Sequence, residues 1–152
     1  MKFTPAFVLV ALYSLPATAA CNIINGQASG DCSNVTITRE QPIRIEVRTV
    51  QSVSDIIAGA MILPRGALHL SGMSNGNIIV RADGLFHVTG LVNGQIVNEG
   101  GSVIVEGTAG SLVMFGGSAH ISGMVGSISG TGTVTCEVGA VIGGDPHTGG
   151  PC

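Results

Sequence analysis

Charged and aromatic residues are scarce in this chain of 152 residues: 10% are charged, 3% are aromatic and none is tryptophan, whereas 45% are hydrophobic. Such an apolar and weakly charged composition argues against an intrinsically disordered protein. The 24 glycines follow no three-residue period, which excludes a collagen triple helix. The aliphatic residues therefore need a fold that buries them and tolerates many glycines, and repetitive β-structure with tight turns meets both needs.

Lysine is absent after residue 20, where five arginines and nine acidic residues give a net charge of −4. The chain has no basic patch, so the sequence predicts no nucleic-acid partner. No apolar run of membrane-spanning length follows the N-terminal segment either, and we expect no membrane span.

Residues 1–20, MKFTPAFVLVALYSLPATAA, have the pattern of a secretory signal peptide: a lysine, an apolar run and closing small residues. A buried N-terminal helix is the alternative. Because Cys21 follows directly, a lipid anchor at Cys21 is a second alternative, although Thr18 stands where bacterial lipoproteins usually carry leucine. We expect an exported protein of the periplasm or cell surface.

Four cysteines lie near the two ends of the exported chain: Cys21, Cys32, Cys136 and Cys152. Exported proteins meet an oxidising compartment, and four cysteines allow three pairings. Short local loops favour Cys21–Cys32 and Cys136–Cys152, whereas a lipidated Cys21 would leave one cysteine unpaired. No C-x-x-C spacing occurs, so we do not expect these cysteines to bind a metal.

Internal repetition is the strongest signal in the sequence. Five units open with GALHLSG, GLFHVTG, GSVIVEG, GSAHISG and GTVTCEV, at intervals of 18, 17, 16 and 15 residues. Each opening alternates as a strand, so its third and fifth residues share one face and its fourth residue points the other way. The expected inward pairs are Leu68/Leu70, Phe86/Val88, Val103/Val105, Ala119/Ile121 and Val134/Cys136.

A second short strand follows in the first four units, in GNIIV, GQIV, GSLVM and GSISG. We interpret Asn75, Asn93 and Asn98 as corner residues. A unit of 15–18 residues cannot bury its own apolar face, so the units must stack and pair in parallel. The sequence therefore predicts an all-β, single-domain parallel β-solenoid, a right-handed or irregular β-helix of about five coils over residues 66–143. An antiparallel sandwich is the alternative, and the recurring unit argues against it.

The segments that flank the repeats have other patterns. Residues 21–65 are expected to cap the solenoid, with alternating strands in NVTIT and IRIEV. Within them, residues 51–63 could form a short helix or an irregular first coil. Residues 144–152 are expected to be a turn-rich C-terminal tail.

The recurring pattern GxVxVxGxxxGxI over about residues 66–143 resembles bactofilins, the polymer-forming β-helix proteins of bacteria. The resemblance rests on glycine and aliphatic spacing, and it implies filament assembly. The export signal, the cysteines and the exclusively arginine basic residues depart from the usual cytoplasmic bactofilin.

The histidines need a separate interpretation. His69 and His87 hold the same position in neighbouring units, and two such imidazoles could share a divalent metal. However, Ile104 interrupts the column before His120, and we expect no carboxylate at a fixed offset beside it. The sequence therefore predicts neither a metal site nor a cofactor, and we interpret the histidines as outward side chains that stack in register.

Catalytic motifs are not apparent. There is no G-x-S-x-G nucleophile elbow and no phosphate-binding G-K-[ST]. Asp83 and Glu99 could pair with His87, but nothing in the sequence selects them. We therefore expect no enzyme activity.

These observations favour an exported, non-catalytic β-solenoid that acts as a binding or scaffolding protein of the bacterial cell envelope. Its expected partner is another protein or a second copy of itself. One alternative is a periplasmic immunity or inhibitor protein against a toxin or lytic enzyme, and another is a self-polymerising envelope protein. The candidate contact face comprises His69, His87, Ile104, His120 and Arg81.

Overall fold

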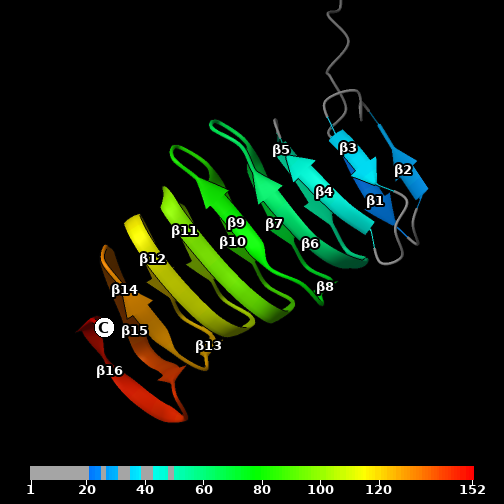
Figure 1. Ribbon diagram of the computed structural model, residues 1–152. Coiled ribbons are helices and arrows are strands. Elements are labelled where there is room, and N and C mark those ends of the chain that lie inside the picture. The colour runs from blue at the N-terminus through cyan, green and yellow to red at the C-terminus, as the bar shows by residue number, and fades with distance from the viewer. Residues whose placement is uncertain (1–20, 25–26, 31–34, 39–42, 48–49) are drawn as a thin grey trace, which may run out of the picture.

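The computed structural model describes residues 21–24, 27–30, 35–38, 43–47 and 50–152. These residues form a parallel β-solenoid of about five turns and contain no helix, as predicted. Successive turns stack from one end of the molecule to the other (Figure 1). The predicted signal segment and Cys32, with its predicted pairing to Cys21, lie outside the described residues.

Two hairpins precede the solenoid turns. Their strands are β1 (Cys21–Ile24), β2 (Gln27–Ser29), β3 (Val35–Thr38) and β4 (Ile43–Val47). β1 pairs antiparallel with β2, and β3 pairs antiparallel with β4. β1 and β4 also pair in parallel with strands of the first solenoid turn, so backbone hydrogen bonds join both hairpins to the solenoid.

The first solenoid turn is formed by β5 (Val50–Val53) and β6 (Ile56–Ile62). The short helix considered for residues 51–63 is therefore wrong. Gln51 and Val53 are buried while Ser52 is exposed, which is the two-residue period of a strand. β5 and β6 pair in parallel with the following turn.

The remaining strands are β7 (Ala67–Leu70), β8 (Met73–Ser74), β9 (Ile78–Arg81), β10 (Leu85–Val88), β11 (Leu91–Val105), β12 (Thr108–Ile121), β13 (Met124–Val125), β14 (Ile128–Gly130), β15 (Thr133–Ile142) and β16 (Asp145–Pro151). β11 and β12 each run through nearly a whole turn, bending at irregularities in the pairing register. Each turn therefore contributes to several parallel ladders.

Two of these ladders carry outward columns of side chains that differ in chemistry. The histidine sheet consists of β5, β7, β10 and residues 102–105, 118–121 and 133–136. The aliphatic sheet consists of residues 60–62, 78–80, 96–98, 112–114 and 128–130.

The core runs along the solenoid interior. Nine of the ten predicted inward residues are at most 4% exposed, and Val134 is half-buried in the last turn. Among the residues whose burial is described, Phe86 is the largest fully buried side chain. At the corner after the histidine sheet, a Cβ on Gly90 would overlap the carbonyl oxygen of Gly72 in the preceding turn. Glycine at this corner therefore lets adjacent turns approach at the spacing of a β-ladder.

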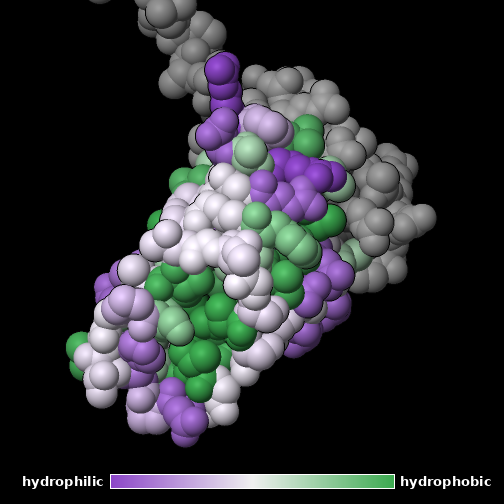
Figure 2. All heavy atoms as spheres, turned by 60° about the vertical axis from the view of Figure 1, so that its left-hand side comes forward, coloured by the Kyte–Doolittle hydropathy of each residue, from purple (hydrophilic) through white to green (hydrophobic). Residues whose placement is uncertain are grey.

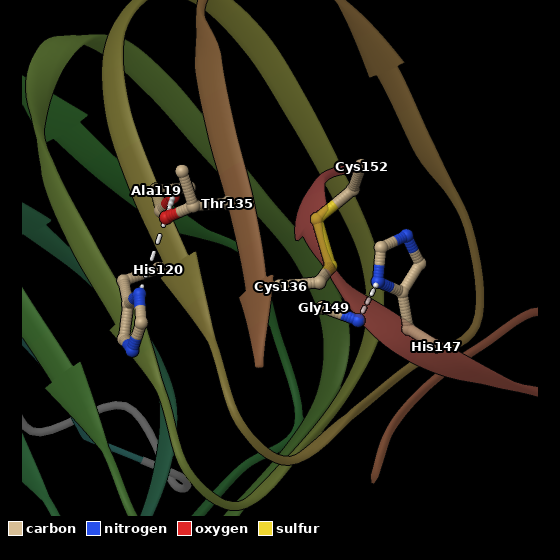
Figure 3. The surroundings of a disulfide bond; sticks show 7 residues. All are labelled: Ala119, His120, Thr135, Cys136, His147, Gly149 and Cys152. Carbon is tan, nitrogen blue, oxygen red and sulfur yellow. Dashed lines mark hydrogen bonds between the residues drawn. A yellow bond between two sulfur atoms is a disulfide. The ribbon is translucent and has the colours of Figure 1, made fainter. Parts of the chain in front are cut away.

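The C-terminal tail differs from the expected turn-rich segment. Residues 145–151 form β16, which reverses at Gly143 and Gly144 and pairs antiparallel with β15. Cys152 forms the predicted disulfide with Cys136, as Figure 3 shows. β15 would otherwise offer an unpaired edge to solvent, and β16 satisfies that edge.

Candidate binding face

One outward column of the histidine sheet carries most of the predicted contact residues. Along this column, parallel pairing places Ser52, His69, His87, Ile104, His120 and Thr135 opposite one another in successive turns. The fourth position of each repeat unit thus forms a single line along the outside of the molecule.

His69 and His87 are in direct contact. Their Nδ1 atoms are 3.0 Å apart, their ring centroids are 4.6 Å apart, and the ring planes make an angle of 67°. Both side chains are half-buried. The two residues are backbone partners in neighbouring strands, so the β-ladder itself holds the two rings close together.

Carboxylates accompany this column at a recurring position, contrary to the sequence-based expectation. Oε2 of Glu106 lies 3.2 Å from Nε2 of His87, and Oε1 of Glu137 lies 3.0 Å from Nε2 of His120. Each glutamate stands two residues beyond the column in the next turn. The sixth letter of the units GSVIVEG and GTVTCEV is the sequence signal that could have revealed both contacts.

The two histidine–glutamate contacts differ in geometry. Nε2 of His120 is within hydrogen-bonding geometry of Glu137, and its Nδ1 lies 3.2 Å from Oγ1 of Thr135 (Figure 3). Nε2 of His87 is buried and close to Glu106, but the contact is out of line for a hydrogen bond. Neither Asp83 nor Glu99 is the carboxylate next to His87.

Arg81 does not belong to this column. It lies at the end of β9, which pairs within the ladder that contains the aliphatic sheet, and its guanidinium pairs with Glu99 of the next turn. A corner at residues 82–84 separates it from β10. The predicted contact face is therefore reduced to the three histidines and Ile104, extended by Glu106 and Glu137.

The fourth histidine, His147, is also outside the column. It lies in β16, where its Nδ1 accepts a hydrogen bond from the backbone N–H of Gly149 at 3.0 Å (Figure 3). His147 therefore contacts the backbone of its own strand, whereas the stacked histidines contact side chains of neighbouring turns.

Hydrophobic side chains are prominent elsewhere on the surface. Met61, Ile79, Val97 and Val113 form an outward, half-buried column on the aliphatic sheet. Figure 2 brings the C-terminal turns forward and shows hydrophobic residues gathered over them. A cavity of about 480 Å³ at this end is lined by Met114, Ile128, Val134 and Cys152, among others, and by no histidine.

Comparison with known proteins identifies no relative: no family model, no curated protein and no solved structure matches the chain. The resemblance to bactofilins therefore extends only to the β-helix repeat architecture that the structure shows. Within the described residues, no helix has the length and hydrophobicity to cross a membrane.

Proposed function

We propose that this chain is an exported, non-catalytic binding or scaffolding protein of the bacterial cell envelope, and that its histidine sheet contacts the partner. The observation that carries the proposal is the in-register outward column of His69, His87, Ile104 and His120. Parallel backbone pairing fixes the spacing of these side chains before any partner arrives, which lowers the entropic cost of binding.

Electrostatics support a protein partner with basic groups. Glu106 and Glu137 are exposed beside the histidine column, with side-chain exposures of 52% and 58%. Arg81 lies on another ladder, and its guanidinium is paired with Glu99. An acidic, rigid surface steers and orients basic partners, and the net charge of the exported chain has the same sign.

At the C-terminal end, a covering strand disfavours end-to-end polymerisation through β15, whereas β14 pairs only with β12 among the described strands. β16 pairs with β15 on both sides of an irregularity between Val138 and Val141. The Cys136–Cys152 disulfide links the terminus to the last turn. A second copy that stacked in parallel on β15 would first have to displace this strand. Such a covered edge is a common protection against strand addition.

The proposal is tested by affinity capture from the native envelope followed by mass spectrometry. A variant with His69→Ser, His87→Ser and Ile104→Ser should fold with a normal far-UV circular dichroism spectrum and lose the partners that the wild-type chain retains. Recovery of a lytic enzyme or toxin would identify the partner as the target of an inhibitor.

The matched control replaces the same number of outward residues on the other sheet: Ile79→Ser, Val97→Ser and Val113→Ser. This variant should retain the partners as long as its circular dichroism spectrum shows a folded solenoid. Undiminished capture by the folded histidine-sheet variant would overturn the proposal.

A further inference from the structure

The contact between His69 and His87 brings together two ring nitrogens of the same kind. Nδ1 faces Nδ1 at 3.0 Å, so one nitrogen must carry a proton and the other must offer a lone pair. Once the intervening proton has moved to another ring nitrogen, both Nδ1 atoms have a lone pair available for one ion, and the ring centroids are 4.6 Å apart. That arrangement is the starting geometry of a two-imidazole metal site.

The nitrogen separation matches the distances that metal coordination requires. With metal–nitrogen bonds of about 2.0–2.1 Å, two imidazole nitrogens lie about 3.3 Å apart on a tetrahedral ion and about 2.9 Å apart as neighbours on a square-planar ion. The observed 3.0 Å falls between these values. We propose that His69 and His87 bind a divalent transition-metal ion such as Zn²⁺, Cu²⁺ or Ni²⁺ through their Nδ1 atoms.

Glu106 favours the ligating form of His87. Its carboxylate is 3.2 Å from the buried Nε2 atom, on the side of the ring away from His69. A carboxylate near Nε2 stabilises the tautomer that carries its proton there, which leaves the lone pair on Nδ1. Histidine ligands of metals commonly have a carboxylate beside their other ring nitrogen, where it fixes the tautomer.

His69 completes the pair by a change of tautomer. With the proton of His87 on Nε2, the proton between the rings belongs to Nδ1 of His69, and on metal binding it would move to Nε2 of the same ring. No proton is lost from the neutral imidazole, so the step needs no additional base. The β-ladder that pairs the two residues holds the rings in place during this exchange.

The site is open to solvent and supplies only two ligands. The His87 side chain is 29% exposed, and within the described part of the chain no group of three or more His, Cys, Asp or Glu residues is placed to hold one ion. Water or a group from another molecule would fill the remaining positions, as at sites that keep exchangeable ligands. We therefore expect modest affinity, with Cu²⁺ binding more tightly than Zn²⁺.

His120 provides an internal control because it belongs to the same column without an imidazole neighbour. Ile104 separates it from His87, and its two nitrogens contact Thr135 and Glu137 instead. Removal of His120 should therefore leave the metal site intact.

The inference is tested by titration of the exported, disulfide-bonded chain with ZnCl₂, CuSO₄ or NiCl₂ in an isothermal calorimeter. One ion should bind per chain, and His69→Ala or His87→Ala should each weaken binding about tenfold or more. His120→Ala and His147→Ala should bind as the wild-type chain does. Equal binding by the wild-type chain and both pair variants would overturn the inference.

Two further measurements separate ligand loss from unfolding. Excess Zn²⁺ should raise the thermal midpoint of the wild-type chain and of His120→Ala, but not that of His87→Ala, since an ion that binds only the folded state stabilises it. Electron paramagnetic resonance of bound Cu²⁺ should show two coordinating nitrogens. A spectrum without histidine nitrogen would contradict the assignment, and neither measurement depends on the proposed protein partner.

Discussion

The histidine sheet and the aliphatic sheet are two ladders built from the same successive turns, and they share one core but differ in what they present to solvent. Facing inward, both carry aliphatic residues such as Leu70 and Ile78, and both of these are fully buried. Facing outward, one carries imidazoles accompanied by carboxylates, whereas the other carries Ile79, Val97 and Val113. The inward positions thus determine the fold, and the outward positions are available for recognition.

The difference also concerns how neighbouring turns interact on the outside. On the aliphatic sheet, equivalent side chains stand opposite one another along one column, as in cross-strand apolar pairs. On the histidine sheet, His69 contacts His87 within the column, and two further contacts run diagonally, from His87 to Glu106 and from His120 to Glu137. The hydrogen-bonding contacts of His120 with Thr135 and Glu137 hold its ring in one orientation, which is useful for a binding surface.

The largest expected effect comes from the core that both sheets share. Phe86→Ala should lower the free energy of unfolding by about 3–5 kcal/mol, because it leaves a large cavity in the interior. Its outward neighbour provides the control: His87→Ala should cost less than about 1 kcal/mol. Urea denaturation followed by circular dichroism measures both, and similar losses would show that the inside and outside of the histidine sheet are not energetically distinct.

A smaller effect is expected at the corner that joins the two sheets. Asn98 is fully buried, and its side chain makes four hydrogen bonds, accepting from the N–H groups of Gly100 and Gly101 and donating to the carbonyls of Gly101 and Ser118. Asn98→Ala should cost about 3 kcal/mol, because it leaves buried backbone groups without partners.

The control for Asn98 is an exposed asparagine. Asn75 accepts a hydrogen bond from Asn93 at the surface, and Asn75→Ala should cost less than about 1 kcal/mol. The same denaturation experiment compares the two variants. A loss at Asn98 no larger than that at Asn75 would contradict a structural role for the buried corner.

Much of the solenoid could be predicted because its core depends on local spacing. The alternation in GLFHVTG identifies Phe86 and Val88 as inward residues, and the repeat interval places His87 beside His69. Asn98 lies at a corner, as the sequence indicates, but its burial was not predicted: it occupies an inward position whose partners in neighbouring turns are Val80 and Met114. Hydrogen bonding to a particular corner backbone is not encoded in a hydrophobic pattern.

The candidate site was less predictable. The contact of His87 with Glu106 joins the fourth position of one unit to the sixth position of the next, and it becomes visible only when the units are stacked. The C-terminal strand β16 was missed for a related reason. Its glycine-rich sequence has weak strand propensity, and pairing with the edge of β15 overrides that propensity.

The smallest expected effect compares the two sheets directly by placing histidine on each. Val97→His puts a ring between Ile79 and Val113 and should cost about 1 kcal/mol, because an apolar cross-strand contact is lost on both sides. Ile104→His puts the same ring between His87 and His120, and we expect a loss of less than about 0.5 kcal/mol. Thermal and urea denaturation at pH 8 measure both changes. Equal losses would mean that the outward residues tolerate a ring equally on both sheets, and the histidine column would then have no energetic distinction from the aliphatic one.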